Sequence, residues 1–323
     1  MDITYLLWLQ ELREATGGIL DGFLEGISDF VISIYAYLIL AFIYWCVDKR
    51  AGMMAAMNIG IGNGINQLAK NIFCVYRPWI RSSAIVPSGN AIATAGGYSF
   101  PSSHTQVATA GFGSIAIWQR KRKWIVVLCG IMILLVMFSR NYLGVHTPQD
   151  VLAGLLLSLL VLRFNNWLID WIEKKTGRDL TVCIIGVLFF LATLIFMTLK
   201  PYPLDYTSDG KLLVDPVNMI AQGYTGAGCA SGFLVGWILE RRFVNFEVPT
   251  GWKRKIGYFA LGILSIIVVV VFFCEPMKGI LRTNGDIGYY LSRFFYFAIL
   301  YIYILAGFPF LLKKLEKQSS RKK

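Results

Sequence analysis

Long apolar segments separated by short polar connections form the main pattern of this chain. A helix of roughly twenty apolar residues is long enough to cross the hydrocarbon core of a bilayer. The pattern therefore predicts an all-α fold, a polytopic membrane helix bundle with about nine transmembrane helices. The predicted spans cover residues 28–47, 51–71, 103–119, 124–139, 150–170, 180–199, 217–239, 256–275 and 288–312.

Three segments depart from a uniformly apolar pattern. Residues 1–27 combine apolar positions at helical spacing with acidic residues, which favours an interfacial helix lying on the membrane surface. The span predicted at 51–71 carries several Asn, Gln and Gly residues, so its polar face must be buried against protein. The glycine-rich stretch 223–232 predicts close contact with a neighbouring helix, because small residues let two backbones approach.

Composition and charge agree with a membrane protein. Hydrophobic residues make up 56% of the 323 residues and charged residues only 15%, whereas about a quarter is usual in soluble domains. The net charge is +12, but the Lys and Arg residues cluster between apolar segments, as they do in cytoplasmic loops, and this argues against a nucleic-acid partner. The six cysteines show no paired spacing, so neither a metal site nor a disulfide framework is expected.

The distribution of Lys and Arg predicts an orientation. Alternate connections between the predicted spans hold twenty basic residues on one side and nine on the other. By the positive-inside rule, the side with twenty is cytoplasmic. The N-terminus is therefore expected outside and the C-terminus inside, and the odd number of spans agrees with this assignment.

Candidate chemistry is confined to three short segments on the predicted outer side. They are Lys70-x6-Arg77-Pro78, Pro101-Ser102-Ser103-His104 and Ser139-Arg140-x5-His146-x3-Asp150. Both histidines of the chain lie in them. Histidine is a proton shuttle and a competent nucleophile near neutral pH, while Lys and Arg neutralise phosphoryl oxygens. This set of side chains indicates phosphoryl transfer without a metal ion.

Each of these features also has a structural explanation. Thr147-Pro148-Gln149-Asp150 is a good helix start, which would make Asp150 a capping residue. Arg77 and Arg140 could anchor span ends at the membrane interface. The functional interpretation is favoured because both histidines and the three cations fall on one side of the membrane. Two further expectations are a phosphate at the helix start of residues 101–104, and support for Lys70 from Asn63 and Gln67 on the same helical face.

The three segments resemble the signature of the type 2 phosphatidic acid phosphatase superfamily, in their order and in their internal spacing. The resemblance implies a six-span phosphatase core at residues 28–199, preceded by the interfacial segment 1–27. Residues 200–323, with three additional spans and a basic cytoplasmic tail, lie outside it. The family commonly has glycine where this chain has Ser103, so a phosphate contact there depends on the backbone amide.

The resemblance also implies the roles of the site residues. His146 would be the nucleophile, Asp150 would hold the other nitrogen of its ring, and His104 would be the general acid. The phosphoryl oxygens would be held by the five residues Lys70, Arg77, Arg140, Ser102 and Ser103.

The function expected from this sequence is hydrolysis of a lipid phosphate or pyrophosphate monoester at the outer membrane face. A phosphohistidine would be the intermediate, with no metal and no cofactor. The expected partners are membrane lipids and a substrate from the outer leaflet, and the expected location is a bacterial plasma membrane. Two alternatives use the same site: a sugar phosphatase like glucose-6-phosphatase, and a lipid phosphotransferase. A transporter is a more distant alternative, suggested by the glycine-interrupted spans.

Overall fold

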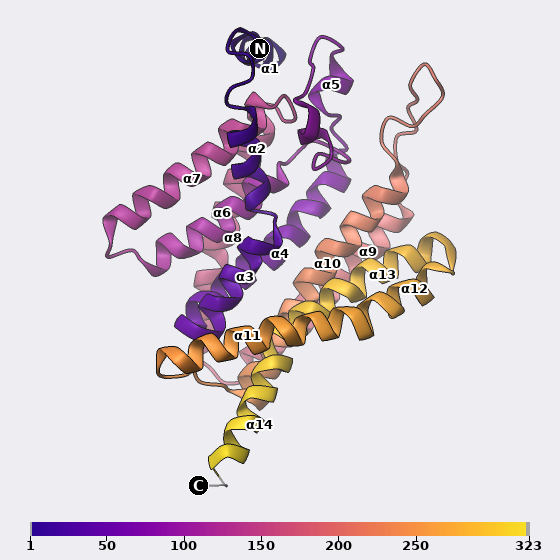
Figure 1. The fold of residues 1–323 in the computed structure, drawn as a ribbon. Coiled ribbons are helices and arrows are strands. Elements are labelled where there is room, and N and C mark those ends of the chain that lie inside the picture. Colours follow the sequence, from indigo (N-terminus) through magenta and orange to yellow (C-terminus); the bar gives the residue numbers. More distant parts are fainter. Residues whose placement is uncertain (1, 321–323) are drawn as a thin grey trace. The chain divides into compact units, whose positions relative to one another are not determined.

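The computed structural model describes residues 2–320, and these residues form helices joined by turns and loops (Figure 1). The only β feature among them is a single antiparallel bridge between Tyr206 and Leu212. The all-α class predicted from the sequence is therefore confirmed.

The helices follow one another along the whole described chain. The α-helices are α1 (Asp2–Ala15), α2 (Asp21–Phe30), α3 (Ile34–Phe42), α4 (Lys49–Phe73), α5 (Pro78–Arg81), α6 (Ser103–Trp118), α7 (Lys123–Tyr142), α8 (Pro148–Glu173), α9 (Arg178–Leu199), α10 (Pro216–Leu239), α11 (Trp252–Val269), α12 (Glu275–Arg282), α13 (Gly285–Ile302) and α14 (Phe308–Ser320). Short 3-10 or π segments are η1 (Ile43–Val47), η2 (Gly89–Ile92), η3 (Glu240–Val244), η4 (Val270–Cys274) and η5 (Tyr303–Gly307).

Five helical segments are long and apolar enough to cross a membrane, which identifies an integral membrane protein. They are α7, α8, α9, the continuous segment Trp252–Arg282 and the continuous segment Gly285–Lys317. Asp21–Phe30 and Ile34–Val47, bent by 46°, would form a sixth if they make one broken span. The expected count of nine stays a prediction, because α4, α6 and α10 do not meet this criterion. With 16 residues, α6 is shorter than a full span, since it rises only about 24 Å.

The described chain divides into two compact units that alternate along the sequence. The first, called the signature unit here, comprises Met1–Tyr37, Ile65–Arg163 and Met197–Gly223. The second, called the extension unit, comprises Leu38–Gly64, Phe164–Phe196 and Tyr224–Lys323. All three signature segments lie in the signature unit. The division into residues 1–27, 28–199 and 200–323 follows the family resemblance instead, and it stays a proposal.

In the signature unit, α6 and α7 run antiparallel and α2 packs against them (Figure 1). Val31, Ala108 and Val136 form the buried centre of this contact. Helix α1 belongs to the same unit, because its Leu6 and Leu9 pack against Ile85. Helices α1, α2, α6 and α7 thus pack together in the unit that contains the candidate site residues.

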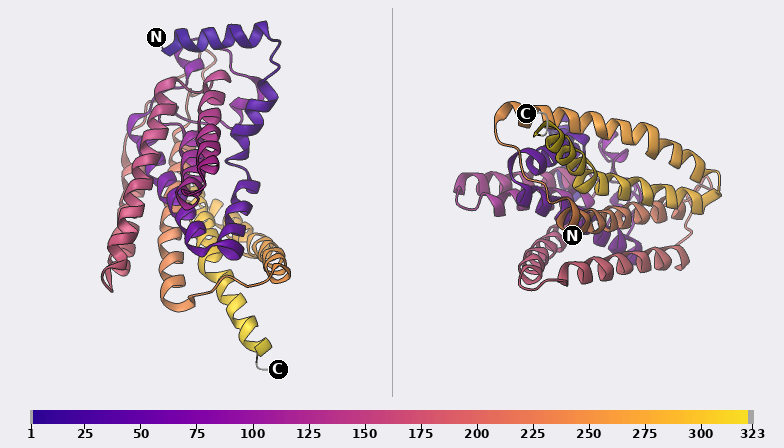
Figure 2. Two further views of the ribbon diagram at one scale, coloured as in Figure 1. Left: turned by 90° about the vertical axis from the view of Figure 1, so that its left-hand side faces the viewer. Right: turned by 90° about the horizontal axis from the view of Figure 1, so that it is seen from below.

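In the extension unit, α10 packs closely against α13. A Cβ atom added at Gly232 would lie 2.6 Å from the Cα of Ala298, and one added at Gly228 would lie 2.4 Å from the carbonyl oxygen of Phe294. Both distances are too short for a real side-chain atom, so the close helix contact expected from the glycine-rich stretch is present. The segments α11 to α12 and α13 lie side by side in the same unit, in orange and yellow in Figure 2.

Candidate active site

The structure brings candidate residues together from the ends of four helices, α4, α6, α7 and α8. Lys70 lies in the last turn of α4, His104 in the first turn of α6, Arg140 in the last turn of α7 and Asp150 in the first turn of α8. Arg77 and His146 occupy the loops that follow α4 and α7. All of these side chains are buried, and Arg140 has no exposed surface at all. So much buried charge is costly unless each group has a partner or a function.

His146 is held through both of its ring nitrogens. Arg77 Nη1 lies 2.8 Å from Nε2, and since arginine can only donate, Nε2 accepts this hydrogen bond. The proton of the neutral ring is therefore on Nδ1, which lies 3.5 Å from Asp150 Oδ2 and 3.3 Å from Ser99 Oγ. The lone pair of Nε2, the one that a nucleophile needs, points towards the cation that would bind a phosphoryl oxygen.

Asp150 has contacts that fit both alternatives left open by the sequence, a helix cap and a partner of His146. Its Oδ2 accepts a hydrogen bond from the backbone N–H of Thr147 at 2.7 Å, as a cap does. The same oxygen accepts a 2.6 Å hydrogen bond from Ser99 Oγ and lies within ion-pair distance of His146. Its backbone carbonyl also accepts the N–H of Ser102 at 2.9 Å, which joins the start of α8 to the start of α6.

Electrostatics keep the imidazole of His146 neutral. Burial lowers the pKa of His146 well below its usual value, and the positive charge of Arg77 lowers it further, while Asp150 opposes both. Burial and the neighbouring Arg140 lower the pKa of Arg77 to about 9, so this guanidinium still carries its charge at neutral pH. A neutral nucleophile beside a fixed cation is the arrangement that attack on a phosphoryl group requires.

Lys70 and Arg77 are anchored to the loop that precedes α6. Lys70 Nζ donates to the carbonyl oxygens of Tyr98 and Ser99 at 2.8 and 3.2 Å. Arg77 donates to the carbonyls of Gly96, Gly97 and Val145 as well as to His146. These hydrogen bonds hold both cations in place and fix the conformation of the loop. Gly97 in this loop has a positive φ of 73°.

Arg140 and His104 carry buried nitrogen atoms that have no hydrogen-bond partner in the described part of the chain. Arg140 donates from Nη1 to Ser28 Oγ at 3.1 Å, while its Nε and Nη2 bond to no other described residue. His104 Nε2 likewise has no hydrogen-bond partner among the described residues. The charges of Arg140, Arg77 and Lys70 all act on His104, so these groups converge on one region. Unpaired donors around a cationic cluster are suited to receive the oxygens of an anion.

The remaining expected residues have structural contacts. Ser102 caps α6 by accepting from the N–H of Thr105 at 3.4 Å, and Ser103 Oγ donates to Asn66 Oδ1 at 2.8 Å. Gln67 is buried near the end of α4 with an unpaired Oε1. Asn63 lies in the extension unit, where its amide donates to Cys229 Sγ at 3.8 Å.

Four polar residues that contact the candidate site were not predicted from the sequence. Two are Ser99, which bonds Asp150, and Asn66, which bonds Ser103. The others are Ser28, which bonds Arg140, and Asp29, which faces His104. Asn66 lies four residues before Lys70, so helical spacing alone could have suggested it. Nothing in the spacing of the sequence links Ser28 or Asp29 to residues more than seventy positions later.

Among residues 2–320, no group of three or more His, Cys, Asp or Glu side chains is arranged to hold a metal ion. The metal-free mechanism expected from the sequence stays a prediction.

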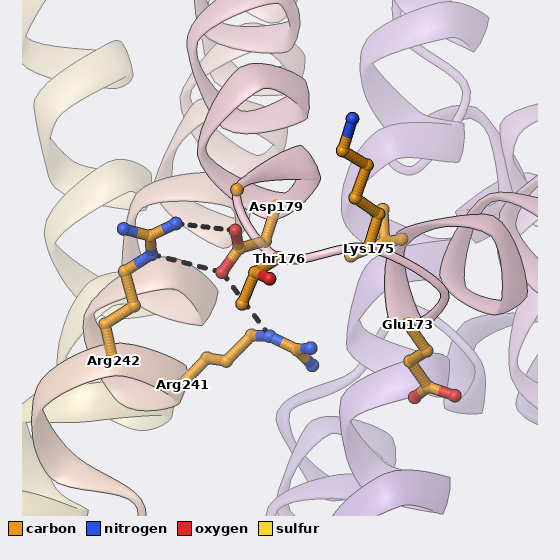
Figure 3. A pocket seen from close by; sticks show the side chains of 8 residues that line it. Glu173, Lys175, Thr176, Asp179, Arg241 and Arg242 are labelled. Carbon is orange, nitrogen blue, oxygen red and sulfur yellow. Dashed lines mark hydrogen bonds and ion pairs between the residues drawn. The ribbon is translucent and has the colours of Figure 1, made fainter.

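A cavity of about 520 Å³ lies in the extension unit and contains none of the signature residues. Figure 3 shows Arg241 and Arg242 directed at Asp179. Arg242 donates two hydrogen bonds to this carboxylate, at 3.1 and 2.6 Å, and Arg241 Nε lies 3.4 Å from it. Asp179 and the two arginines are thus paired with each other, as in a structural ion pair at the start of α9.

Two family models match the chain. One, described as the PAP2 superfamily, matches residues 51–174. The other, described as the PAP2 superfamily phosphatase, transmembrane extension, matches residues 224–321. The first range contains all three signature segments, and the second contains most of the helices of the extension unit. No solved structure matches the chain.

Curated relatives include phosphatases that act on lipids. Human sphingosine-1-phosphate phosphatase 2 is 29% identical over 256 residues, which is 73% of this chain and 60% of the relative. Undecaprenyl-diphosphatase BcrC of Bacillus subtilis is 32% identical over 48% of this chain and 80% of its own length. Phosphatidylglycerophosphatase B of the same organism is 26% identical over 47% of this chain and 72% of its own length. The chain thus spans less than two thirds of the human relative.

Proposed function

This chain belongs to the PAP2 superfamily, and we propose that it is a phosphoric monoester hydrolase that removes phosphate from a lipid phosphate or pyrophosphate. The reaction takes place at the outer membrane face and proceeds through a phosphohistidine. The observation that carries the proposal is the arrangement around His146. Its Nε2 lone pair faces Arg77, and its Nδ1–H faces Asp150 and Ser99.

In the first half-reaction, Nε2 of His146 attacks the phosphorus atom while the bond between phosphorus and the lipid oxygen breaks. His104 gives its proton to the departing oxygen, and Asp150 supports the positive charge that develops on the His146 ring. Lys70, Arg77 and Arg140 stabilise the charge on the phosphoryl oxygens. Phosphoryl transfer depends mainly on such positioning and charge stabilisation.

In the second half-reaction, water attacks the phosphorus atom of the phosphohistidine. His104 takes a proton from this water, the bond between nitrogen and phosphorus breaks, and inorganic phosphate leaves. His146 is then neutral and His104 protonated, as at the start. If a lipid or sugar hydroxyl replaced the water, the same residues would perform phosphotransfer.

A lipid is the preferred substrate class because the relatives named above act on lipid phosphates by their names, and because the site lies in a membrane protein. Glucose 6-phosphate is the second candidate, since the signature alone does not distinguish a soluble sugar phosphate from a lipid. Nothing in residues 200–323 favours a sugar site.

The experiment that tests the proposal is a phosphate-release assay on the purified protein. The panel contains phosphatidic acid, sphingosine 1-phosphate, phosphatidylglycerophosphate, undecaprenyl pyrophosphate and glucose 6-phosphate. Release from at least one lipid, and its loss in His146→Ala, is expected. Adding an acceptor alcohol separates hydrolysis from transfer, because a transferase would form the new ester at the expense of free phosphate. Lack of release from every lipid would contradict the proposal.

The metal-free mechanism is tested in the same assay. Activity should survive EDTA, and vanadate should compete with the substrate because it presents an anion to the same cations. Complete loss with EDTA that one divalent cation restores would overturn this part of the proposal. Failure of vanadate to compete would count against the assigned phosphate site.

A further inference from the structure

We propose that Asp29 of α2 is a positioning residue for His104, and that α2 thereby completes the active site. This inference rests on the proposed function, in which His104 is the general acid. Asp29 Oδ1 lies 3.9 Å from His104 Nε2, the nitrogen that has no hydrogen-bond partner among the described residues. Residues 2–50 lie outside both matched family ranges, so the family matches assign no role to Asp29.

The position of Asp29 is fixed by contacts on several sides. Thr94 Oγ1 donates a hydrogen bond to Asp29 Oδ1 at 3.3 Å. The preceding residue, Ser28, is fully buried and accepts a hydrogen bond from Arg140. Two residues later, Val31 packs against Ala108 of α6, one turn after His104. The carboxylate is therefore held beside the histidine by the packing of α2 on α6 and α7.

The charges around His104 explain why a carboxylate is needed there. Arg140, His146, Arg77 and Lys70 act on it electrostatically, and a protonated imidazole is disfavoured beside three cations in a buried site. A general acid must nevertheless carry a proton when the lipid oxygen departs. Asp29 lies within ion-pair distance of His104, so its negative charge opposes the cations and stabilises the imidazolium form.

The geometry also suggests how the contact acts. A separation of 3.9 Å is longer than a hydrogen bond, so the interaction is between charges and strengthens when His104 is protonated. The side chain of Asp29 is 38% exposed whereas that of His104 is 6% exposed. Asp29 thus lies between the buried acid and the exterior of the unit. Among the described residues, no hydrogen bond or ion pair joins it to the nucleophile or to the three cations, although its charge also acts on Arg140.

The test compares two substrates with different leaving groups in the full-length protein. Phosphatidic acid in detergent micelles has a basic alkoxide leaving group and needs the acid, whereas para-nitrophenyl phosphate has a good leaving group and needs it little. Asp29→Asn should lower kcat for phosphatidic acid by about 10-fold or more, out of the roughly 100- to 10,000-fold that a general acid supplies. Its kcat for para-nitrophenyl phosphate should change by less than about 2-fold.

Three further measurements distinguish positioning from a structural role. Asp29→Glu should restore most of the rate on phosphatidic acid, because it restores the charge. In Asp29→Asn, the alkaline limb of the kcat profile should move to lower pH, because an imidazolium without its carboxylate loses its proton earlier. Glu11→Gln removes an exposed carboxylate of α1 and should match the wild type on both substrates.

Other outcomes overturn the inference. Equal losses on both substrates, with no recovery in Asp29→Glu, would assign Asp29 to folding alone. If Asp29→Asn cannot be purified, Thr94→Val takes its place. It removes the hydrogen bond to Asp29 and should produce the same selective loss in weaker form, whereas an unchanged ratio between the two substrates would refute the inference. A wild-type protein that hydrolyses no lipid would instead contradict the proposed function itself.

Discussion

His146 illustrates how a single residue is prepared by its surroundings. Burial and the charge of Arg77 lower its pKa, so the free imidazole should stay neutral as the pH falls through 6.5, and protonate only well below that value. We therefore expect kcat/KM for para-nitrophenyl phosphate to hold through pH 6.5, once corrected for the second ionisation of the substrate, near 6. A pH profile from about 4.5 to 8 measures this. An acidic limb centred at 6.5 or higher after correction would contradict it.

Ser99 should contribute to catalysis through Asp150. Its hydroxyl donates to Asp150 Oδ2 at 2.6 Å, and Thr147 N–H donates to the same oxygen, so one donor remains when Ser99 is changed. Ser99→Ala should cost about 1–2 kcal/mol, a fall of about 5- to 30-fold in kcat, with KM nearly unchanged. The matched control is Ser158→Ala, a buried serine bonded to the Gln106 carbonyl, which should keep the wild-type kcat. A rise in KM alone would assign Ser99 to substrate binding instead.

The site residues that the sequence could predict are those tied to short-range spacing. His146 and Asp150 are four residues apart and meet across the start of one helix, which the sequence makes visible. Ser99 and Asp29 act across loops or between helices, and their partners lie 51 and 75 positions away. Only tertiary packing brings such pairs together, so the sequence pattern cannot predict them.

At the scale of helices, the apolar pattern predicted most helix bounds well, but it did not predict a break in the first range. The range 180–199 became α9, Arg178–Leu199, within two residues at its start. The single span predicted at 28–47 is instead divided among α2, α3 and a π segment with a bend of 46°. Hydropathy averages over a window and contains no signal for such a break. It also could not show that α2 turns Ser28 and Asp29 towards the site.

The contact between α10 and α13 provides a prediction about an element. Gly232→Ala would place a Cβ atom 2.6 Å from Ala298 Cα and 2.7 Å from its carbonyl oxygen, and backbone atoms cannot move aside as a side chain can. Overpacking of this kind costs about 1–3 kcal/mol, so the apparent Tm in detergent should fall. Gly257→Ala on α11 is the same change with no atom within 4 Å, and it should leave Tm unchanged or slightly higher. Equal Tm values for the two variants would contradict close packing between α10 and α13.

At the scale of the molecule, the two compact units do not follow the division into residues 1–27, 28–199 and 200–323 that the family resemblance implies. The signature unit collects residues from three separate stretches, including Met197–Gly223, most of which the resemblance leaves outside its six-span core. Within that unit, Tyr202 OH donates to Asn71 Oδ1 at 2.7 Å and Tyr76 OH donates to Asp205 Oδ2 at 2.5 Å. The segment after α9 is therefore part of the unit that holds the site. Contacts of this kind, more than 120 residues apart in sequence, were beyond the reach of local patterns.

The membrane topology is the prediction that depends on the whole chain. The excess of Lys and Arg on one side places residues 79–100 outside and residues 120–123 inside. The helix between them, α6, has only 16 residues and is not among the segments that meet the length and hydropathy criterion. It can cross only if the bilayer thins locally or if polar positions at its ends lie in the headgroup region. The orientation of the active site therefore depends on whether this one short helix spans.

Labelling of single cysteines in intact cells decides the question. Ser83→Cys and Lys121→Cys introduce exposed thiols into the two loops, and Cys74, the native cysteine that is not buried, is replaced by serine in both. A membrane-impermeant maleimide should label position 83 in intact cells and position 121 only after permeabilisation. Labelling of both in intact cells, or of neither, would mean that α6 does not span. In that case the count of Lys and Arg on each side of the membrane would change, and the proposed outer location of the site would need a separate measurement.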